Sequence, residues 1–418
     1  MSQVLPSNPT VAAPTAPLWL PVFSTAFVVV NLITSEFLPV SLLTPIAHDL
    51  GISEGAAGQM ISATSIAAVF TSLLTASVTR RLDRKVVLLI ASAALVLSNV
   101  LVALSPNLIV IMLARLLLGL AMGGFWSLSN ATALRLVPRS FLPRALAIIS
   151  GGVALANVVA APLGSLLGAA LGWRGVFVIA ALLGVAGLVW QWVSLPRMAP
   201  GRPAELKTLV HLLERRQVQV GMAALLLTFG GFMTFFAYLR PFLEQVTQIG
   251  VAQISGVLLI LGVAGLIGTA LSSRLLTWNL RRTHILVPLV MGVLTLGLLF
   301  VGHAPLWTIL LLTLWGLTNS VLPVAWGNWV AHAVPDEPES AGGLQVAAIQ
   351  FGMTLGAGLG GLAFDDSGST GLLLGSGAAL LAGALLIWKG LSHQTAPALE
   401  PLDVGNGSMT GWPGEVTE

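Results

Sequence analysis

The chain of 418 residues contains no cysteine and very little charge. The absence of cysteine excludes disulfide bonds, thiolate metal sites and thiol nucleophiles. Only 8% of the residues are charged and 56% are hydrophobic, whereas a soluble globular chain carries about 25% charged residues. The mean hydropathy is +0.92. This composition excludes an ordinary soluble protein and indicates a polytopic membrane protein.

Motifs of ATP-driven pumps and of zinc proteases are also absent. The sequence contains no GxxxxGK[ST] and no HExxH, which removes the usual support for either activity. A membrane-embedded enzyme would need at least two convergent catalytic groups, and none is visible in the sequence. We therefore expect no enzymatic activity, no cofactor and no metal site.

Apolar runs long enough to cross a bilayer recur along the chain. A spanning helix needs about 20 apolar residues, because each adds about 1.5 Å toward a hydrocarbon core of about 30 Å. A helix satisfies its own backbone hydrogen bonds in lipid, so each run is expected to be helical. The sequence predicts twelve spans, near residues 18–44, 56–79, 86–104, 108–134, 145–170, 175–195, 218–240, 253–275, 284–302, 306–331, 342–363 and 370–389.

The longest polar connection divides the twelve spans into six and six. The first span holds EFLPV and the seventh holds YLRPF, each with a proline near its outer end. Six-helix repeats of this kind are typical of transporters whose site lies between the halves. We expect an all-α fold of two six-helix bundles with inverted repeats. The predicted divisions are a flexible tail at 1–17, bundles at 18–195 and 218–390, a cytoplasmic linker at 196–217 and a second flexible tail at 391–418.

Lys and Arg residues fall almost entirely on one side of the predicted spans. If both termini are cytoplasmic, the inner loops hold sixteen of the nineteen, the outer loops hold Arg174 and Arg240, and Arg115 lies inside a span. Loops rich in Lys and Arg face the cytoplasm, so we expect a multi-pass protein of a bacterial inner membrane with both termini inside. Anionic inner-leaflet lipid then explains the pI of about 9.9 without a nucleic-acid partner.

Glu36 and Arg115 are the two charged residues that this assignment leaves inside spans. A charge at the centre of a spanning helix costs about 2.5–3.5 kcal/mol on insertion scales. Both residues are predicted at similar depth in the outer half of the same bundle, where they can share a hydrogen-bond network. We interpret Glu36 as a proton-coupling acid and Arg115 as the residue that organises charge and water around it. The alternative is that both serve only helix packing.

Aromatic and amide side chains near mid-membrane are candidates for ligand contact. Three phenylalanines of the seventh span share one face at i, i+3 and i+4. Aromatic planes with amide donors and acceptors suit a neutral, flat, polar ligand such as a nucleoside or a sugar. The same residue types also join helices, which stays open as the alternative. The candidates are Asn31, Asn157, Phe232, Phe235, Phe236, Tyr238, Asn319 and Gln350.

Glycines at four-residue spacing mark two predicted helix contacts. Small residues at this spacing let two membrane helices approach closely. The sequence therefore predicts tight packing at Gly119 and Gly123, and again at Gly352, Gly356 and Gly360.

Several motifs resemble those of the major facilitator superfamily, specifically its twelve-helix drug/proton antiporter family, over about residues 18–390. RLDRKVVLL resembles the family's basic loop between helices two and three, with an acid where glycine is common. RLLLG matches a fourth-helix motif linked to proton transfer, and AAPLG resembles the antiporter motif of helix five. Beside Arg115, the resemblance marks Asp83, Arg84, Lys85, Gly119, Pro162 and Gly164 as gating or motif residues.

Within that family, longer strings are similar to segments of purine ribonucleoside exporters. They include EFLPVSLLTPIAHDLGISEG, LGLAMGGFWSLS and LPVAWGNW. The resemblance implies a proton-coupled antiporter, expected to be a monomer in contact with membrane lipid, that exports nucleoside-like molecules by alternating access. Sugar or drug efflux by the same fold stays open, as does a membrane-embedded sensor or channel without coupled transport.

Overall fold

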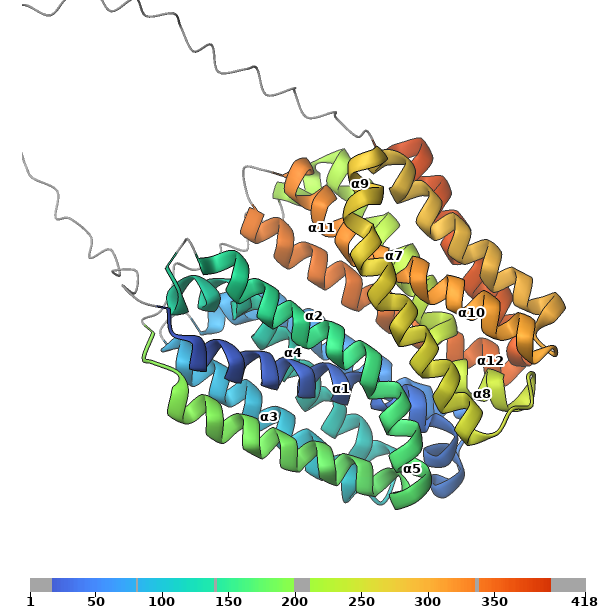
Figure 1. Cartoon of the computed structure of the whole chain (residues 1–418), viewed down its shortest axis with the longest axis horizontal. Coiled ribbons are helices and arrows are strands. Elements are labelled where there is room, and N and C mark those ends of the chain that lie inside the picture. The colour runs from blue at the N-terminus through green and yellow to red at the C-terminus, as the bar shows by residue number, and fades with distance from the viewer. Residues whose placement is uncertain (1–16, 80–81, 139–140, 199–210, 335–337, 392–418) are drawn as a thin grey trace, which may run out of the picture.

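The computed structural model describes residues 17–79, 82–138, 141–198, 211–334 and 338–391. Every element in these residues is a helix (Figure 1). The expected tails lie almost entirely outside the described residues, as does most of the expected linker. The helices are α1 (Trp19–Leu50), α2 (Glu54–Val78), α3 (Arg84–Ala103), α4 (Leu108–Leu136), α5 (Leu142–Ser194), α7 (Arg216–Phe236), α8 (Leu239–Gln245), α9 (Val251–Val301), α10 (Pro305–Asn319), α11 (Val321–Ala333) and α12 (Pro338–Gly390).

Nine segments of the described residues are long and apolar enough to cross a membrane. Three of these, in α5, α9 and α12, are 51 residues long, which is about 77 Å and more than twice the hydrocarbon core. Each is a pair of helices joined at one non-helical residue, Gly172, Asn279 or Gly368. The two glycines have φ of 74° and 62°, which residues with a β-carbon rarely adopt. Counting the three pairs as two spans each gives the twelve predicted spans.

The seventh and tenth spans are present but broken. The seventh is divided between α7 and α8 at Tyr238, and the tenth between α10 and α11 at Ser320. Each of these residues precedes a proline by three positions, Pro241 and Pro323. Proline has no N–H to donate, and its ring clashes with the carbonyl group four residues earlier. The break in each span is therefore a local consequence of its proline.

The first six spans form one bundle and the last six form another (Figure 1). Within the bundles, α1 packs on α5, α2 on α4 and α7 on α12, while α2 with α12 and α5 with α9 join the two bundles. Twelve crossings return the chain to its starting side, so Trp19 and Lys389 mark one end of the molecule, which we call the terminal end. The opposite end carries the turns at Gly51 and Gly172, and we call it the distal end.

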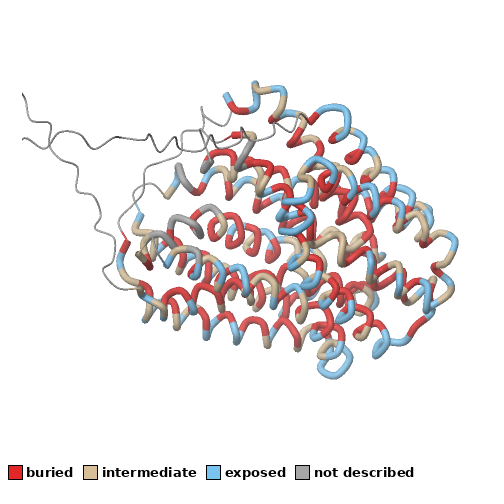
Figure 2. Tube along the Cα trace, turned by 45° about the horizontal axis from the view of Figure 1, so that its top comes forward, coloured by how far each residue is buried: buried red, intermediate tan, exposed pale blue. Residues whose placement is uncertain are grey.

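The outer surface of the helices is apolar. Figure 2 shows exposed residues on the outward sides of the helices and buried residues where helices meet. Large apolar side chains are among the exposed residues, including Phe300 at 85% and Leu306 at 76%. Such exposure would favour aggregation in water, but it is what a protein surrounded by lipid requires.

Glycines provide the closest helix contacts within each bundle. A β-carbon on Gly119 of α4 would lie 2.5 Å from the β-carbon of Ala67 on α2. A β-carbon on Gly352 of α12 would lie 2.8 Å from the carbonyl oxygen of Leu226 on α7. The predicted small-residue contacts are therefore confirmed as tight helix crossings. Similarly close contacts are made by Gly123, Gly356 and Gly360.

We predict that Gly119→Ala lowers the stability of the purified protein by about 1–3 kcal/mol, because overpacking a tight core costs this much. Thermal unfolding in detergent measures the change. Gly375→Ala is the matched control, because a β-carbon at Gly375 would meet no atom of the described residues within 4 Å beyond the adjacent backbone of its own helix. Equal melting temperatures for the two variants would contradict the close contact.

Candidate functional site

The site is built around a defect in the hydrogen bonding of α1. Pro39 lies inside this helix, and because proline has no N–H, the carbonyl group of Ser35 loses its normal helical partner. The Nη1 atom of Arg115 donates to this carbonyl oxygen at 2.7 Å, and Nη2 donates to the carbonyl oxygen of Glu36 at 3.0 Å. Arg115 is completely buried. Its guanidinium group thus replaces a backbone donor that α1 lacks.

The carboxyl group of Glu36 lies where the two bundles meet. Glu36 is 4% exposed, and the side chain of Gln350 on α12 lies near its carboxyl group from the opposite bundle. The Oε1 atom of Glu36 and the Nε atom of Arg115 are buried with no hydrogen-bond partner among the residues that the structure describes. Leaving a buried polar group unpaired costs about 1–3 kcal/mol. The arrangement can therefore gain free energy by taking up a proton, a water molecule or a polar ligand.

A second proline in α1 produces a second defect. Pro45 lies inside the helix and removes the helical partner of the Ser41 carbonyl group. The Nη1 atom of Arg240 on α8 donates to that oxygen, and its Nε atom donates to Glu244 at 2.8 Å. Arg240 comes from the second bundle, so this contact joins the two bundles.

Arg240 corrects one expectation from the sequence. It was expected in an outer loop, but it is 6% exposed and lies within α8. It is therefore a further buried charge beside Glu36 and Arg115. The feature of the sequence that could have indicated this burial is the position of Arg240 directly before Pro241, the proline that breaks the seventh span.

More hydrogen bonds join the bundles along α2 and α12 toward the distal end. The hydroxyl group of Ser62 donates to the carbonyl oxygen of Thr354 at 3.1 Å. Farther out, the carboxylate of Asp365 accepts the hydroxyl group of Ser53 at 2.7 Å and the backbone N–H of Gly55 at 3.1 Å. These contacts hold the bundles together at the distal end.

Tyr238, a predicted substrate residue, takes part in this distal contact. It is fully buried, and its hydroxyl group donates to the carbonyl oxygens of Ala357 at 2.9 Å and Gly55 at 3.4 Å. Its ring stacks on Phe364 with 5.6 Å between centroids. These bonds fasten Tyr238 to helix backbones at the distal end.

An aromatic stack of the second bundle meets α1 at Phe37, the residue next to Glu36. Phe232 and Phe236 of α7 stack on Trp315 of α10, with centroids 5.5 and 6.3 Å apart and interplanar angles of 19° and 14°. Phe37 of α1 meets Phe236 edge-on at 5.8 Å. Sequence reasoning missed Phe37 and Trp315, because both belong to helices remote in sequence from α7. The adjacency of Phe37 to Glu36 was the one signal available.

The other predicted ligand residues differ in how far they are buried and in what they contact. The side chain of Asn31 donates to the carbonyl oxygen of Ala180 at 3.1 Å, which holds α1 against α5 inside the first bundle. Phe235 is fully buried and meets Trp315 edge-on. Asn157 is exposed on α5, and Asn319 is half-buried at the end of α10. The structure therefore brings Glu36, Arg115, Gln350, Phe232 and Phe236 to one region, whereas Asn31 is engaged in helix packing.

The predicted basic loop, Asp83 to Lys85, hydrogen-bonds to the segment that follows α5 and so holds the start of α3 against it. Asp83 is the N-cap of α3 and accepts the backbone N–H groups of Lys85 at 2.8 Å and Met198 at 3.0 Å. The backbone N–H of Arg84 donates to the carbonyl oxygen of Met198 at 3.0 Å. The Nζ atom of Lys85 donates to the carbonyl oxygen of Leu195 at 2.7 Å. These contacts join parts of one bundle.

The helix-five motif lies against α1 and also near the second bundle. A β-carbon on Gly164 would lie 2.9 Å from Cδ2 of Leu38, so α5 approaches α1 closely at the level of the site. Pro162 removes the helical partner of the Val158 carbonyl group. That oxygen lies 3.0 Å from the β-carbon that Gly262 of α9 would carry. Gly164 thus allows close approach of α5 to α1, and Gly262 allows close approach of α9 to the other side of α5.

Comparison with known proteins places the chain among transport proteins. Residues 25–344 match the Major Facilitator Superfamily. The chain is 48% identical over 373 residues to the transcription regulatory protein OpdE of Pseudomonas aeruginosa, covering 88% of this chain and 92% of that protein. It is 42% identical over 388 residues to the purine ribonucleoside efflux pump NepI of Escherichia coli K12, covering 93% of this chain and 98% of that protein.

Two solved structures share the fold. A D-xylose-proton symporter matches with a TM-score of 0.72 and 16% identity, covering 89% of this chain and 96% of that one. The human organic anion transporter MFSD10 matches with a TM-score of 0.65 and 17% identity, covering 89% and 100%. The family and the twelve-helix fold expected from the sequence are both confirmed. The chain belongs to the major facilitator superfamily of membrane transporters.

Proposed function

We propose that the protein is a proton-coupled antiporter that exports purine ribonucleosides across a bacterial inner membrane by alternating access. The observation that carries the proposal is the buried carboxyl group of Glu36. It has an unpaired oxygen, contacts Gln350 of the other bundle and lies beside the carbonyl groups that Arg115 binds.

A proton on Glu36 changes the contact between the bundles. The ionised carboxylate only accepts hydrogen bonds, whereas the protonated acid also donates one. Protonation therefore changes how the side chain interacts with Gln350 and removes a negative charge near Arg115. In our proposal the described state is closed on the outer side, at the distal end. Uptake and release of the proton then bias which side of the membrane the site faces.

The energy of one proton is sufficient for useful export. One elementary charge moving through 100 mV yields about 2.3 kcal/mol, and each pH unit adds about 1.4 kcal/mol. About 1.4 kcal/mol supports a tenfold gradient of a neutral solute. A single coupled proton therefore supports a gradient of tenfold or more.

The aromatic stack supports a flat heterocyclic substrate. Phe232, Phe236 and Trp315 present parallel ring faces, and such faces stack on purine bases. In our proposal, substrate binding separates these rings and inserts the base beside them. Gln350, Asn157 and Asn319 are our candidates for polar contacts to the base or ribose. The 42% identity to a purine ribonucleoside efflux pump adds to this support.

Two alternatives have specific support. Export of a sugar or drug fits the same fold and the same buried acid. A regulatory role fits the 48% identity to a protein named as a transcription regulator, since a membrane sensor of this fold would bind a ligand without moving it. Flux measurements separate the two classes, because a sensor shows saturable binding and no transport.

The proposed topology follows from the distribution of charge. We place the terminal end and both termini in the cytoplasm, because sixteen of the nineteen Lys and Arg residues fall in the predicted inner loops. We assign residues 18–195 and 218–390 to the two bundles and residues 196–217 to the cytoplasmic linker. We propose that the protein works as a monomer.

We predict that Glu36→Gln abolishes nucleoside accumulation driven by a pH gradient in proteoliposomes while exchange of labelled for unlabelled substrate continues. The amide cannot take up the coupling proton, so the roughly tenfold accumulation expected per pH unit is lost. Glu214→Gln, which changes an exposed carboxylate, is the control and accumulates substrate as the wild type does. Normal accumulation by Glu36→Gln, with unchanged pH dependence, would show that Glu36 is not the coupling acid.

We predict that Phe236→Leu weakens inosine binding by about 5- to 150-fold, because stacking of a base on an aromatic ring contributes about 1–3 kcal/mol. Titration of the purified protein with labelled inosine measures the change. Phe300→Leu makes the same substitution at an outward-facing position and is expected to leave affinity unchanged. If both variants bind alike, the stack is not the base site.

A further inference from the structure

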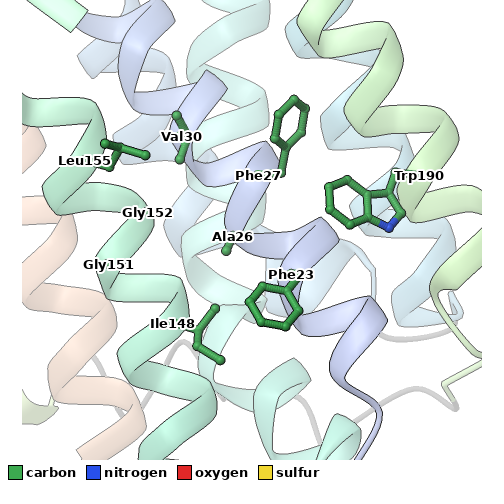
Figure 3. Close-up of a pocket in the computed structure, with 9 residues that line it drawn as sticks. All are labelled: Phe23, Ala26, Phe27, Val30, Ile148, Gly151, Gly152, Leu155 and Trp190. Atoms are coloured by element: carbon green, nitrogen blue, oxygen red, sulfur yellow. The ribbon is translucent and has the colours of Figure 1, made fainter. Parts of the chain in front are cut away.

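A groove of about 460 Å³ lies on the first bundle and shares no residue with the candidate site. Figure 3 shows that side chains from α1 and from both helices of α5 surround it. All of the lining residues are apolar or aromatic, and they belong to segments long enough to span the membrane. The groove is therefore bordered by hydrocarbon in the bilayer. Its larger side chains are Phe23, Phe27, Val30, Ile148, Leu155 and Trp190.

Two adjacent glycines of α5 give the groove its depth. A β-carbon on Gly152 would lie 2.9 Å from the carbonyl oxygen of Ala26, so α1 and α5 cross closely there and form a floor. Apart from the adjacent backbone of its own helix, a β-carbon on Gly151 would have no atom of the described residues within 4 Å. The space beside Gly151 is thus open to a β-carbon, and a larger side chain placed there would extend into the groove that Gly151 lines.

The side chains of Trp19 and Arg144 form a cation–aromatic pair beside the groove, on the side that faces the terminal end of the molecule. Trp19 precedes Phe23 by four residues and Arg144 precedes Ile148 by four, so each lies one turn below a lining residue on the same helix face. The guanidinium carbon of Arg144 is 5.3 Å from the ring centroid of Trp19. Arg144 is exposed and lies in the first turn of the long helix α5.

We propose that this groove binds an acyl chain of an anionic phospholipid, with the lipid phosphate against Arg144. Tryptophan and arginine at the ends of spanning helices occupy the headgroup level of the bilayer. The phosphate of a phospholipid lies at this level when the acyl chain of the same lipid occupies the groove. Charge complementarity selects an anionic lipid, because a basic residue near the membrane surface contributes about 1 kcal/mol to its binding. The site is independent of which solute the protein moves.

The test uses the full-length protein purified in detergent and native mass spectrometry. Phosphatidylglycerol and phosphatidylcholine with the same acyl chains are titrated separately. We expect one phosphatidylglycerol to bind more tightly than phosphatidylcholine. Arg144→Gln should weaken phosphatidylglycerol binding about fivefold, which corresponds to the loss of about one favourable charge interaction. Gly151→Leu should weaken binding of both lipids, because its side chain fills the groove.

Two matched controls separate a specific site from general effects. Arg282→Gln removes a guanidinium that lies over Trp278 in the same way, with 5.7 Å to the ring centroid, but away from the groove. Gly375→Leu adds the same bulk at an open glycine of α12. Binding by both controls should equal that of the wild type. The proposal is overturned if Arg144→Gln and Gly151→Leu bind lipid as these controls do, or if phosphatidylcholine binds as tightly as phosphatidylglycerol.

Discussion

Two backbone carbonyl groups that prolines leave without helical partners organise the centre of this molecule. In lipid no water is present to replace a missing backbone donor, so each unpaired carbonyl group must find a protein partner. Pro39 and Pro45 of α1 create this demand, and Arg115 and Arg240 meet it with guanidinium donors. The cost of burying each arginine is offset by a hydrogen bond that the helix itself cannot make.

The two arginines act on different sides of α1. Arg115 comes from α4 of the same bundle, so it fixes the part of α1 that carries Glu36 within the first bundle. Arg240 comes from α8 of the second bundle, so its contact with Ser41 can form and break as the bundles move. Glu36 lies at the Arg115 anchor, and Gln350 of the second bundle lies near its carboxyl group. This arrangement supports our proposal that a proton on one acid shifts the position of one bundle relative to the other.

Hydropathy and charge predicted much of this molecule, since both are local properties of the sequence. The twelve spans followed from apolar runs, and the family followed from short motifs. Membership in a transporter family also confirms the expectation that the chain is not an enzyme. Glu36 and Arg115 were found because the predicted spans contain few other charged residues. The burial of Arg240 was not predicted, because it depends on a carbonyl group 199 positions earlier in the sequence. Trp315 was missed for the same reason, since only the folded chain places it against α7.

The central claim, that Arg115 replaces the backbone donor lost at Pro39, is tested most directly by a double-mutant cycle on thermal stability. Pro39→Ala restores an N–H for the Ser35 carbonyl group, and Arg115→Leu removes the guanidinium donor. The account predicts that Arg115→Leu is less destabilising by about 1–3 kcal/mol when residue 39 is alanine. The effect on Glu36 is the same in both backgrounds and cancels. An equal loss of stability in the two backgrounds would contradict the account.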